Sequence, residues 1–320
     1  MFKYIPTVSD SQEILDRAFK KTKKVIISDR HPFYKKKKTM IKKIETFSTT
    51  IIEILNNYVK NYPSINNLPK FYQELIDITL SVDKLKKSLG AIDWAKKTSE
   101  KIFLSQIRYL RKTGELKIIM KKENEIYGRI SSVVKQVNKD LNYLSEAGKI
   151  LKKFPTVEDI ETVVLAGYPN VGKSSLLTCL SNAKPKIATY PFTTKEIFIG
   201  HIKYNIKYID KKIQIIDTPG LLDRDIDKKN DIELQAIAAI KHLADMIIFI
   251  LDPTETCGYS KKDQESLYKE LKKMFKDLNF LIVENKIDIK KTKSKNLKIN
   301  CKTGEGIEEL RKEIINFYDS

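Results

Sequence analysis

The sequence predicts an α/β domain preceded by an all-helical domain. In residues 1–160, apolar side chains recur every three or four positions and only four glycines occur, which is typical of amphipathic helices. In residues 161–320, short apolar runs alternate with amphipathic stretches. That alternation favours a mostly parallel, six-stranded sheet flanked by helices. We expect the helical domain at 1–157 and the α/β domain at 158–320, since 320 residues allow about two domains.

Apolar stripes and chain breakers define the expected helices of the first domain. One stripe covers 41–58, a second covers 126–144, and a third opens at Leu85 and continues to about Lys112. Each stripe follows one face of an α-helix. Proline and glycine separate the stripes, so we expect an antiparallel bundle of four or five helices.

Two further local patterns complete the first domain. Asp10 followed by Glu13 is typical of a capped helix start, and that first helix should end near Lys24. Trp94 and Tyr109 lie in an apolar helical stretch, so we expect them in the core rather than on the surface as platforms for stacked bases.

The positive charge is concentrated in the first half. The chain has 60 Lys and Arg and 41 Asp and Glu, a net charge of +19. Residues 1–160 hold 33 basic and 18 acidic side chains, whereas residues 161–320 hold 27 and 23. This asymmetry indicates a polyanionic partner, either nucleic acid or an anionic membrane; the alternative is a well-solvated, charge-rich surface. The candidate phosphate contacts are Lys20, Lys21, Lys23, Lys24, Lys35, Lys36, Lys37 and Lys38.

Several protein classes are excluded by composition. Hydrophobic residues make up 41% of the chain, enough to build a core. No apolar run approaches the roughly 20 residues of a membrane helix. Cys179, Cys257 and Cys301 lie far apart without a CxxC pair, which argues against a disulfide framework or a zinc ribbon. We expect a soluble protein of a reducing cytosol.

The expected elements of the second half alternate along the chain. Candidate strands are 162–166, 196–204, 212–216, 246–251, 280–283 and 297–300. Candidate helices lie near 173–183, 231–243, 262–276 and 306–317.

The strongest motif follows the first of these strands. Residues 167–174 read GYPNVGKS and fit GxxxxGK[ST], the loop whose backbone N–H groups surround phosphates. Lys173 is expected to reach the β- and γ-phosphates, and Ser174 to place its hydroxyl on Mg²⁺. The candidate nucleotide-binding residues in this loop are Asn170, Val171, Gly172, Lys173, Ser174 and Ser175.

A second motif, Asp217-Thr218-Pro219-Gly220, follows the third strand. Asp217 is expected to hold the outer shell of the Mg²⁺, and the Gly220 N–H to meet the γ-phosphate. Between these two motifs lie Thr193 and Thr194, either of which can join Mg²⁺ only while the γ-phosphate is present.

The remaining motifs select the base. Asn285, Lys286 and Asp288 form NKxD, in which the aspartate accepts hydrogen bonds from guanine N1 and N2. Adenine lacks that donor pair, which disfavours an ATP-using kinase or helicase. After the last strand, the loop Asn300, Cys301 and Lys302 is expected to meet guanine O6. GTP and GDP are therefore the expected ligands.

These residues carry a family resemblance. GYPNVGKSS, YPFTT, DTPG and NKID resemble the Obg family of translation-factor-class P-loop GTPases. The resemblance implies that Thr194 is the threonine that reaches Mg²⁺, and that Lys173, Thr194 and Gly220 serve hydrolysis. Leu221 stands where other GTPases have a catalytic glutamine, so intrinsic turnover should be slow. Asn170 is a candidate K⁺ ligand; alternatively it only shapes the loop.

The first half narrows the resemblance. The IPTV start (residues 5–8) and the basic helical domain resemble Nog-type nucleolar GTP-binding proteins, and the end near Tyr318 resembles an archaeal short form. The resemblance implies a cytoplasmic GTPase of large ribosomal subunit biogenesis. Its expected partner is large-subunit rRNA or a pre-ribosomal particle, with no DNA, no membrane and a monomeric state. Two alternatives stay open: a GTP-binding assembly scaffold without catalysis, and a membrane-surface GTPase.

Overall fold

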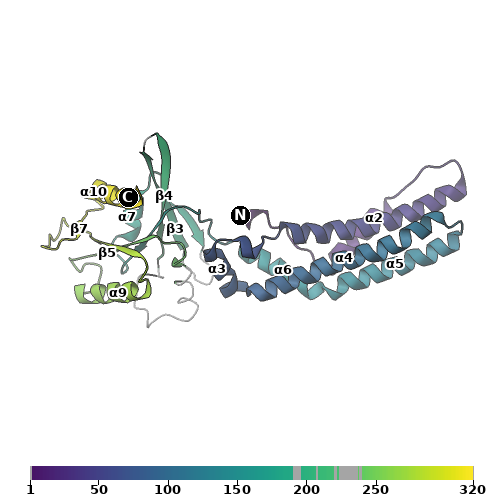
Figure 1. Ribbon diagram of the computed structural model, residues 1–320, viewed down its shortest axis with the longest axis horizontal. Helices are drawn as coiled ribbons and strands as arrows, with labels where there is room; N and C mark the ends of the chain where they lie inside the picture. The colour runs from purple at the N-terminus through teal and green to yellow at the C-terminus, as the bar shows by residue number, and fades with distance from the viewer. Residues whose placement is uncertain are drawn as a thin grey trace. The chain divides into compact units, whose positions relative to one another are not determined.

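The structure is a computed structural model that describes residues 2–189, 196–206, 208–219, 222, 237 and 240–319 (Figure 1). The chain divides into two compact units. The first joins Met1–Asn67 with Leu80–Lys152, and the second joins Leu68–Thr79 with Lys153–Ser320. The division into units falls at 152/153, five residues before the predicted domain boundary at 157/158, and residues 68–79 of the helical half group with the second unit.

Helices build the first unit. Three of them, α2, α4 and α5, contact one another pairwise and run side by side (Figure 1). Their apolar stripes point inward, with Ile44, Phe47 and Ile51 of α2 fully buried. The elements are η1 (Phe2–Tyr4), α1 (Ser11–Lys23), α2 (Pro32–Asn61), η2 (Ile65–Asn67), α4 (Val82–Lys112), α5 (Leu116–Gln136) and α6 (Asn138–Leu151).

The local predictions for this unit have mixed outcomes. Asp10 caps α1, because its carboxylate accepts a hydrogen bond from Glu13 N at 2.8 Å. The stripe over 126–144 is not one helix, since the chain breaks between α5 and α6 at Val137. The expected core positions of Trp94 and Tyr109 are wrong: these rings are 47% and 51% exposed. They lie off the face of α4 that carries the buried residues.

A sheet forms the centre of the second unit. Its strand order is β2-β3-β4-β1-β5-β6-β7, in which β4, β1, β5, β6 and β7 are parallel and β2 and β3 are antiparallel. The α/β fold is confirmed, with one strand more than expected, the short edge strand β2. The strands are β1 (Thr162–Ala166), β2 (Lys186–Thr189), β3 (Glu196–Ile206), β4 (Ile209–Asp217), β5 (Met246–Leu251), β6 (Asn279–Glu284) and β7 (Leu297–Lys298).

The second unit also contains helices. In the part of the chain that the structure describes, they include α3 (Lys70–Leu80), α7 (Lys173–Leu180), α9 (Lys261–Met274) and α10 (Ile307–Asp319). Every residue of β1 and β5 is buried, as expected for central parallel strands covered on both faces. The carboxyl ends of the parallel strands meet at one edge, where ligands bind in open α/β sheets. Within the described ranges, no helix is both long and apolar enough to cross a membrane.

Candidate nucleotide-binding site

The loop after β1 has the backbone that its glycines predict. Gly167 has φ +135°, and a Cβ there would lie 2.6 Å from the carbonyl oxygen of Ile250. Gly172 has φ +105°, and its Cβ would lie 2.2 Å from Nδ2 of Asn285. Both positions require glycine, because an L side chain would be strained and would also collide. Asn170 has φ +62°, a left-handed conformation that asparagine tolerates better than most residues.

Lys173 begins α7 and is 7% exposed. Its ammonium donates to the carbonyl oxygens of Gly167 and Tyr168 at 2.8 and 2.9 Å. These bonds hold the side chain back across its own loop, at the amino end of a helix where partial positive charge gathers. A buried ammonium and a helix N-terminus together favour an anion such as a phosphate.

The magnesium candidates lie together. The hydroxyl of Ser174 donates to Oδ2 of Asp217 at 2.5 Å, and Asp217 is fully buried at the end of β4. A hydroxyl beside a carboxylate is the hard-oxygen donor set that Mg²⁺ prefers. These two residues therefore fit a magnesium ion. Next in the chain, the buried Thr218 Oγ1 has no hydrogen-bond partner among the described residues.

Asn285 connects the phosphate loop to the base loop. It is 4% exposed at the end of β6. Its Nδ2 donates to the carbonyl oxygen of Val171 at 2.9 Å, and its Oδ1 accepts from Cys301 N at 3.3 Å. One amide thus joins the loop of Asn285 to the phosphate loop, 114 positions away, and to the loop after β7, 16 positions away.

The loop after β7 is shaped by Asn300. Its Oδ1 accepts from the backbone N of Lys302 at 2.8 Å, and its buried Nδ2 has no hydrogen-bond partner in the part of the chain that the structure describes. Burial raises the pKa of the Cys301 thiol to about 12, so this thiol stays protonated at neutral pH. Asp288 is exposed, with its carboxylate open to solvent at the same edge of the sheet.

Asp252 is a site residue that the motifs did not identify. It follows β5 and is fully buried, and Lys286 donates to its Oδ2 at 2.6 Å. The same carboxylate accepts hydrogen bonds from Thr254 N, Thr256 Oγ1 and Cys257 N at 2.9–3.1 Å. Burial opposes ionisation, but the hydrogen bonds from Lys286 and Thr254 prevail and lower the pKa of Asp252. Asp252 therefore orients the lysine of the base loop.

The loop after β5 also reaches the phosphate loop. The rings of Tyr168 and Tyr259 stack with centroids 4.0 Å apart and an interplanar angle of 25°. Gln264 of α9 holds the loop after β5 in place, because its amide donates to the carbonyl oxygens of Asp252 and Tyr259 in that loop. The sequence could have identified Asp252 by its position directly after a buried strand. Candidate site residues also follow the carboxyl ends of β1, β4 and β6.

Not every predicted residue can be placed. Thr193, Thr194, Gly220 and Leu221 lie outside the described residues. Ser175 is exposed on α7 next to Ser174. In the helical unit, Lys37 donates to the carbonyl oxygen of Arg111 at 2.9 Å and Lys38 pairs with Asp29 at 2.7 Å. The exposed candidates are Lys20, Lys21, Lys23, Lys24, Lys35, Lys36 and Lys38.

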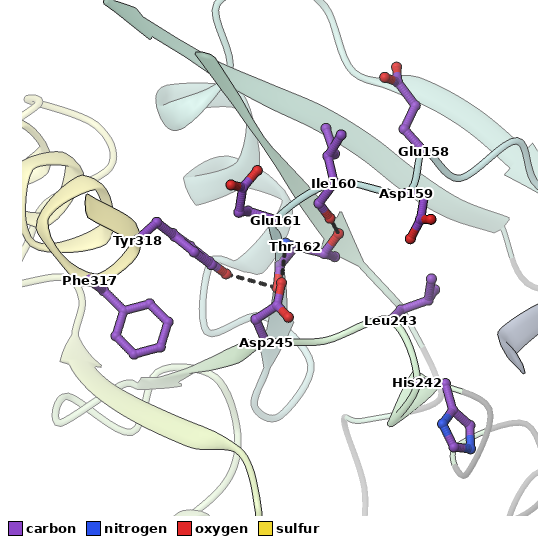
Figure 2. A pocket seen from close by; sticks show the side chains of 10 residues that line it. All are labelled: Glu158, Asp159, Ile160, Glu161, Thr162, His242, Leu243, Asp245, Phe317 and Tyr318. Carbon is purple, nitrogen blue, oxygen red and sulfur yellow. Dashed lines mark hydrogen bonds between the residues drawn. The ribbon is translucent and has the colours of Figure 1, made fainter. Parts of the chain in front are cut away.

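A different hollow lies at the amino ends of β1 and β5 (Figure 2). It has a volume of about 580 Å³, and four carboxylates line it together with His242, Phe317 and Tyr318. Thr162 N donates to Asp245 at 2.7 Å, and burial raises the pKa of Asp245. A triphosphate would be repelled by these carboxylates, so this hollow does not suit a nucleotide. The four carboxylates are Glu158, Asp159, Glu161 and Asp245.

Comparison with known proteins gives matches in both halves of the chain. Residues 2–158 match the model of the NOG1 N-terminal helical domain, and residues 231–288 match that of nucleolar GTP-binding protein 1. An uncharacterised Methanocaldococcus jannaschii protein is 38% identical over 292 residues, covering 90% of this chain and 81% of the relative.

Nucleolar GTP-binding protein 1 of Kluyveromyces lactis is 33% identical over 90% of this chain and 45% of the relative, so the chain spans less than half of that protein. A solved structure of nucleolar GTP-binding protein 1 from Plasmodium falciparum is 31% identical, with a TM-score of 0.43 over 52% of this chain and 92% of that one. With a helical unit, a G-domain-like sheet and both family models matched in order, the chain belongs to the nucleolar GTP-binding protein 1 family.

Proposed function

We propose that this chain is a cytoplasmic GTP-binding and GTP-hydrolysing switch protein of large ribosomal subunit assembly, whose helical unit docks on rRNA. The observation that carries the nucleotide assignment is the bridge made by Asn285. It joins the phosphate loop at Val171 to the base loop at Cys301. One buried amide thereby sets the spacing between the triphosphate and base positions, as a guanine nucleotide site requires.

The phosphate end has groups for binding and for charge stabilisation. Lys173 has only to leave the two loop carbonyl oxygens for the β- and γ-phosphates, where its charge offsets the charge of the transition state. Mg²⁺ would be held by Ser174 with Asp217 behind it, and would neutralise phosphate charge there. Thr194 and Gly220 complete the proposed γ-phosphate contacts and order the switch.

At the base end, Asp288 is the proposed acceptor for guanine N1 and N2. The Nδ2 of Asn300 is a buried donor near the loop expected to meet guanine O6. Asp288→Asn should weaken GTP binding by about 100-fold or more, because one acceptor becomes a donor facing a donor. The same variant should gain affinity for xanthosine triphosphate, whose acceptor matches the new amide.

Isothermal titration with GTP and xanthosine triphosphate measures both effects. Asp277→Asn is the matched control, since Asp277 is an exposed carboxylate of the same unit whose ion-pair partner among the described residues is Lys241. Unchanged GTP affinity in Asp288→Asn would refute the proposed base site.

The rRNA proposal has support in the helical unit. A hollow of about 340 Å³ lies between α1 and Thr50 and Ile54 of α2. Its cations are Arg17, Lys20 and Lys21 of α1 and Lys24, which caps the end of that helix. Several cations around one groove bind a phosphate backbone with little dependence on sequence.

If the protein is a switch, its affinity for large subunits should differ between GDP and a non-hydrolysable GTP analogue. Equal affinity in filter binding would contradict the switch.

Leu221 favours one other candidate function, a GTP-binding scaffold without turnover, because leucine cannot position water as glutamine does. Phosphate release measured in KCl, in NaCl and with ribosomal subunits distinguishes the two. Stimulation by K⁺ would support Asn170 as an ion ligand. Equal rates in both salts would favour the loop-shaping role that its left-handed backbone already serves.

A further inference from the structure

Part of the positive charge of residues 161–320 is concentrated in one segment. Residues 181–212 contain seven lysines and two acidic residues, a larger excess than the +4 of residues 161–320 as a whole. This segment covers β2, β3 and the start of β4. Five of these lysines, Lys184, Lys186, Lys203, Lys211 and Lys212, belong to the described part of this segment, on the antiparallel side of the sheet. A second lysine-rich stretch, residues 285–302, includes the loops expected to bind the base.

Part of this segment encloses a hollow of about 280 Å³. Its wall is formed by the chain before β2, by the first residue of β2, by β3 and by β4. Lys184, Lys186 and Lys203 are exposed at its rim. The cations that line it are Lys184, Lys186, Lys203 and Lys212.

One carboxylate faces these four ammonium groups. Glu158 pairs with Lys212 and lies 3.5 Å from Nε2 of His201. Burial lowers the pKa of His201, so the imidazole is neutral at neutral pH and adds no charge. Glu158 offsets only one of the four charges, and the hollow keeps an excess of positive charge. An anion is the ligand that such a site favours.

The hollow continues along the β3–β4 pair. A second hollow of about 540 Å³ shares Lys203 and Lys212 with the first. It adds Asp210 and Lys211, and Lys211 pairs with Asp319 at 2.7 Å. Here the two strands extend beyond the sheet, because β4 pairs with β1 only from Gln214 onward (Figure 1). Tyr208, at the turn that joins β3 to β4, is fully exposed.

The length of this groove decides between ligands. A free phosphate would fill one hollow, whereas a phosphodiester chain can contact the lysines of both. An exposed tyrosine beside a row of cations suits RNA, whose unpaired bases stack on aromatic rings. We propose that the groove lined by Lys184, Lys186, Lys203 and Lys212 is a second RNA-binding surface, located on the nucleotide-binding unit itself. This inference deepens the proposed rRNA docking and rests on it for the identity of the partner.

The test uses the full chain and an in vitro transcript of large-subunit rRNA. The groove variant is Lys184→Gln/Lys186→Gln/Lys203→Gln, which spares the Lys212–Glu158 pair. The control is Lys262→Gln/Lys269→Gln/Lys273→Gln, which removes three exposed lysines of α9 in the same unit. A third variant, Lys20→Gln/Lys21→Gln/Lys24→Gln, tests the helical unit. Unchanged GDP affinity and melting temperature show that each variant is folded.

The groove variant should bind the transcript about tenfold or more weakly than its control. The slope of log K against log salt should become shallower by about 2, since each lost phosphate contact removes 0.7–0.9. If the groove variant binds RNA as tightly as its α9 control, the inference is overturned. It is also overturned if the groove variant loses binding to phosphatidylserine vesicles but keeps its RNA affinity. If only the helical-unit variant loses RNA, the proposed function stands and this inference fails. If only the groove variant loses RNA binding, this inference stands, and the helical unit is not the surface that docks on rRNA.

Discussion

The two units use lysine in opposite ways. In the nucleotide-binding unit, Lys173 is 7% exposed and makes two hydrogen bonds to its own loop, and Lys286 pairs with a fully buried carboxylate. In the helical unit, the candidate lysines of α1 are exposed. A buried ammonium is held in one position by a fixed set of partners. Exposed lysines instead contribute together, through their total positive charge.

This difference teaches where single substitutions should matter. A buried charge that loses its partner destabilises the fold strongly, while an exposed pair contributes about 0–1 kcal/mol. We therefore expect large effects of single changes around the nucleotide loops and small, additive effects on the basic surfaces.

The largest effect is expected for Asp252→Ala. The change leaves Lys286 without its counter-charge and removes the acceptor of four further donors, Thr254 N, Thr254 Oγ1, Thr256 Oγ1 and Cys257 N. The free energy of unfolding should fall by about 3–5 kcal/mol, as for buried pairs that lose one partner. Urea denaturation at pH 7 measures the change.

Asp277→Ala is the control for Asp252→Ala, because Asp277 pairs with Lys241 at 2.9 Å on the surface. It should cost about 0–1 kcal/mol. A similar small loss in both variants would remove the distinction between buried and exposed charge in this protein.

The carboxylate of Asp252 should also make the stability of the protein sensitive to acid. Because the folded-state pKa of Asp252 lies below its unfolded value, its stabilisation is complete above the unfolded pKa of about 3.9 and is lost as the pH falls through the folded pKa. Asp252→Asn should therefore flatten the dependence of stability on pH below about pH 4. Urea titrations of both proteins from pH 7 to acid pH provide the comparison.

A smaller effect on stability, but a large one on binding, is expected for Lys173→Gln. The amide can keep a hydrogen bond to the loop carbonyl oxygens of Gly167 and Tyr168, so the fold should persist. Loss of charged hydrogen bonds to phosphate, each about 1.5–3 kcal/mol, should weaken GTP binding by about 10- to 100-fold. Fluorescent nucleotide titration measures it, with the exposed Lys262→Gln as control. GTP affinity equal in the two variants would show that Lys173 does not contact the nucleotide.

Much of the fold could be predicted because burial on both faces leaves a strong sequence pattern. The limits of β1 and β5 match the predicted strands, since both are unbroken apolar runs. The edge strand β2 could not be found this way: Ile187 is 61% exposed, and the strand exists through its pairing with β3. Likewise, the stripe of α5 and α6 predicted helix correctly but not the break at Val137.

The same contrast applies to the site. Asn285 was identified by its motif, yet its bonds to Val171 and Cys301 depend on the folded sheet. Asp252 has no motif, and its partner Lys286 lies 34 positions along the chain. A local pattern can identify residues that act on a ligand, whereas residues that orient other side chains become visible only in three dimensions.

The smallest effect is expected for Lys21→Gln. Lys21 is exposed and lines the α1 groove with Arg17, Lys20 and Lys24, so three cations remain to hold the same backbone. Affinity for large-subunit rRNA should fall only about two- to fivefold, and the salt slope should become shallower by about 1. Lys139→Gln, an exposed lysine of α6 outside that groove, is the control. Filter binding across a salt series decides the point: a loss as large as that expected at Lys173 would mean that the helical unit also binds through a single, specific lysine, and the contrast between the two units would fail.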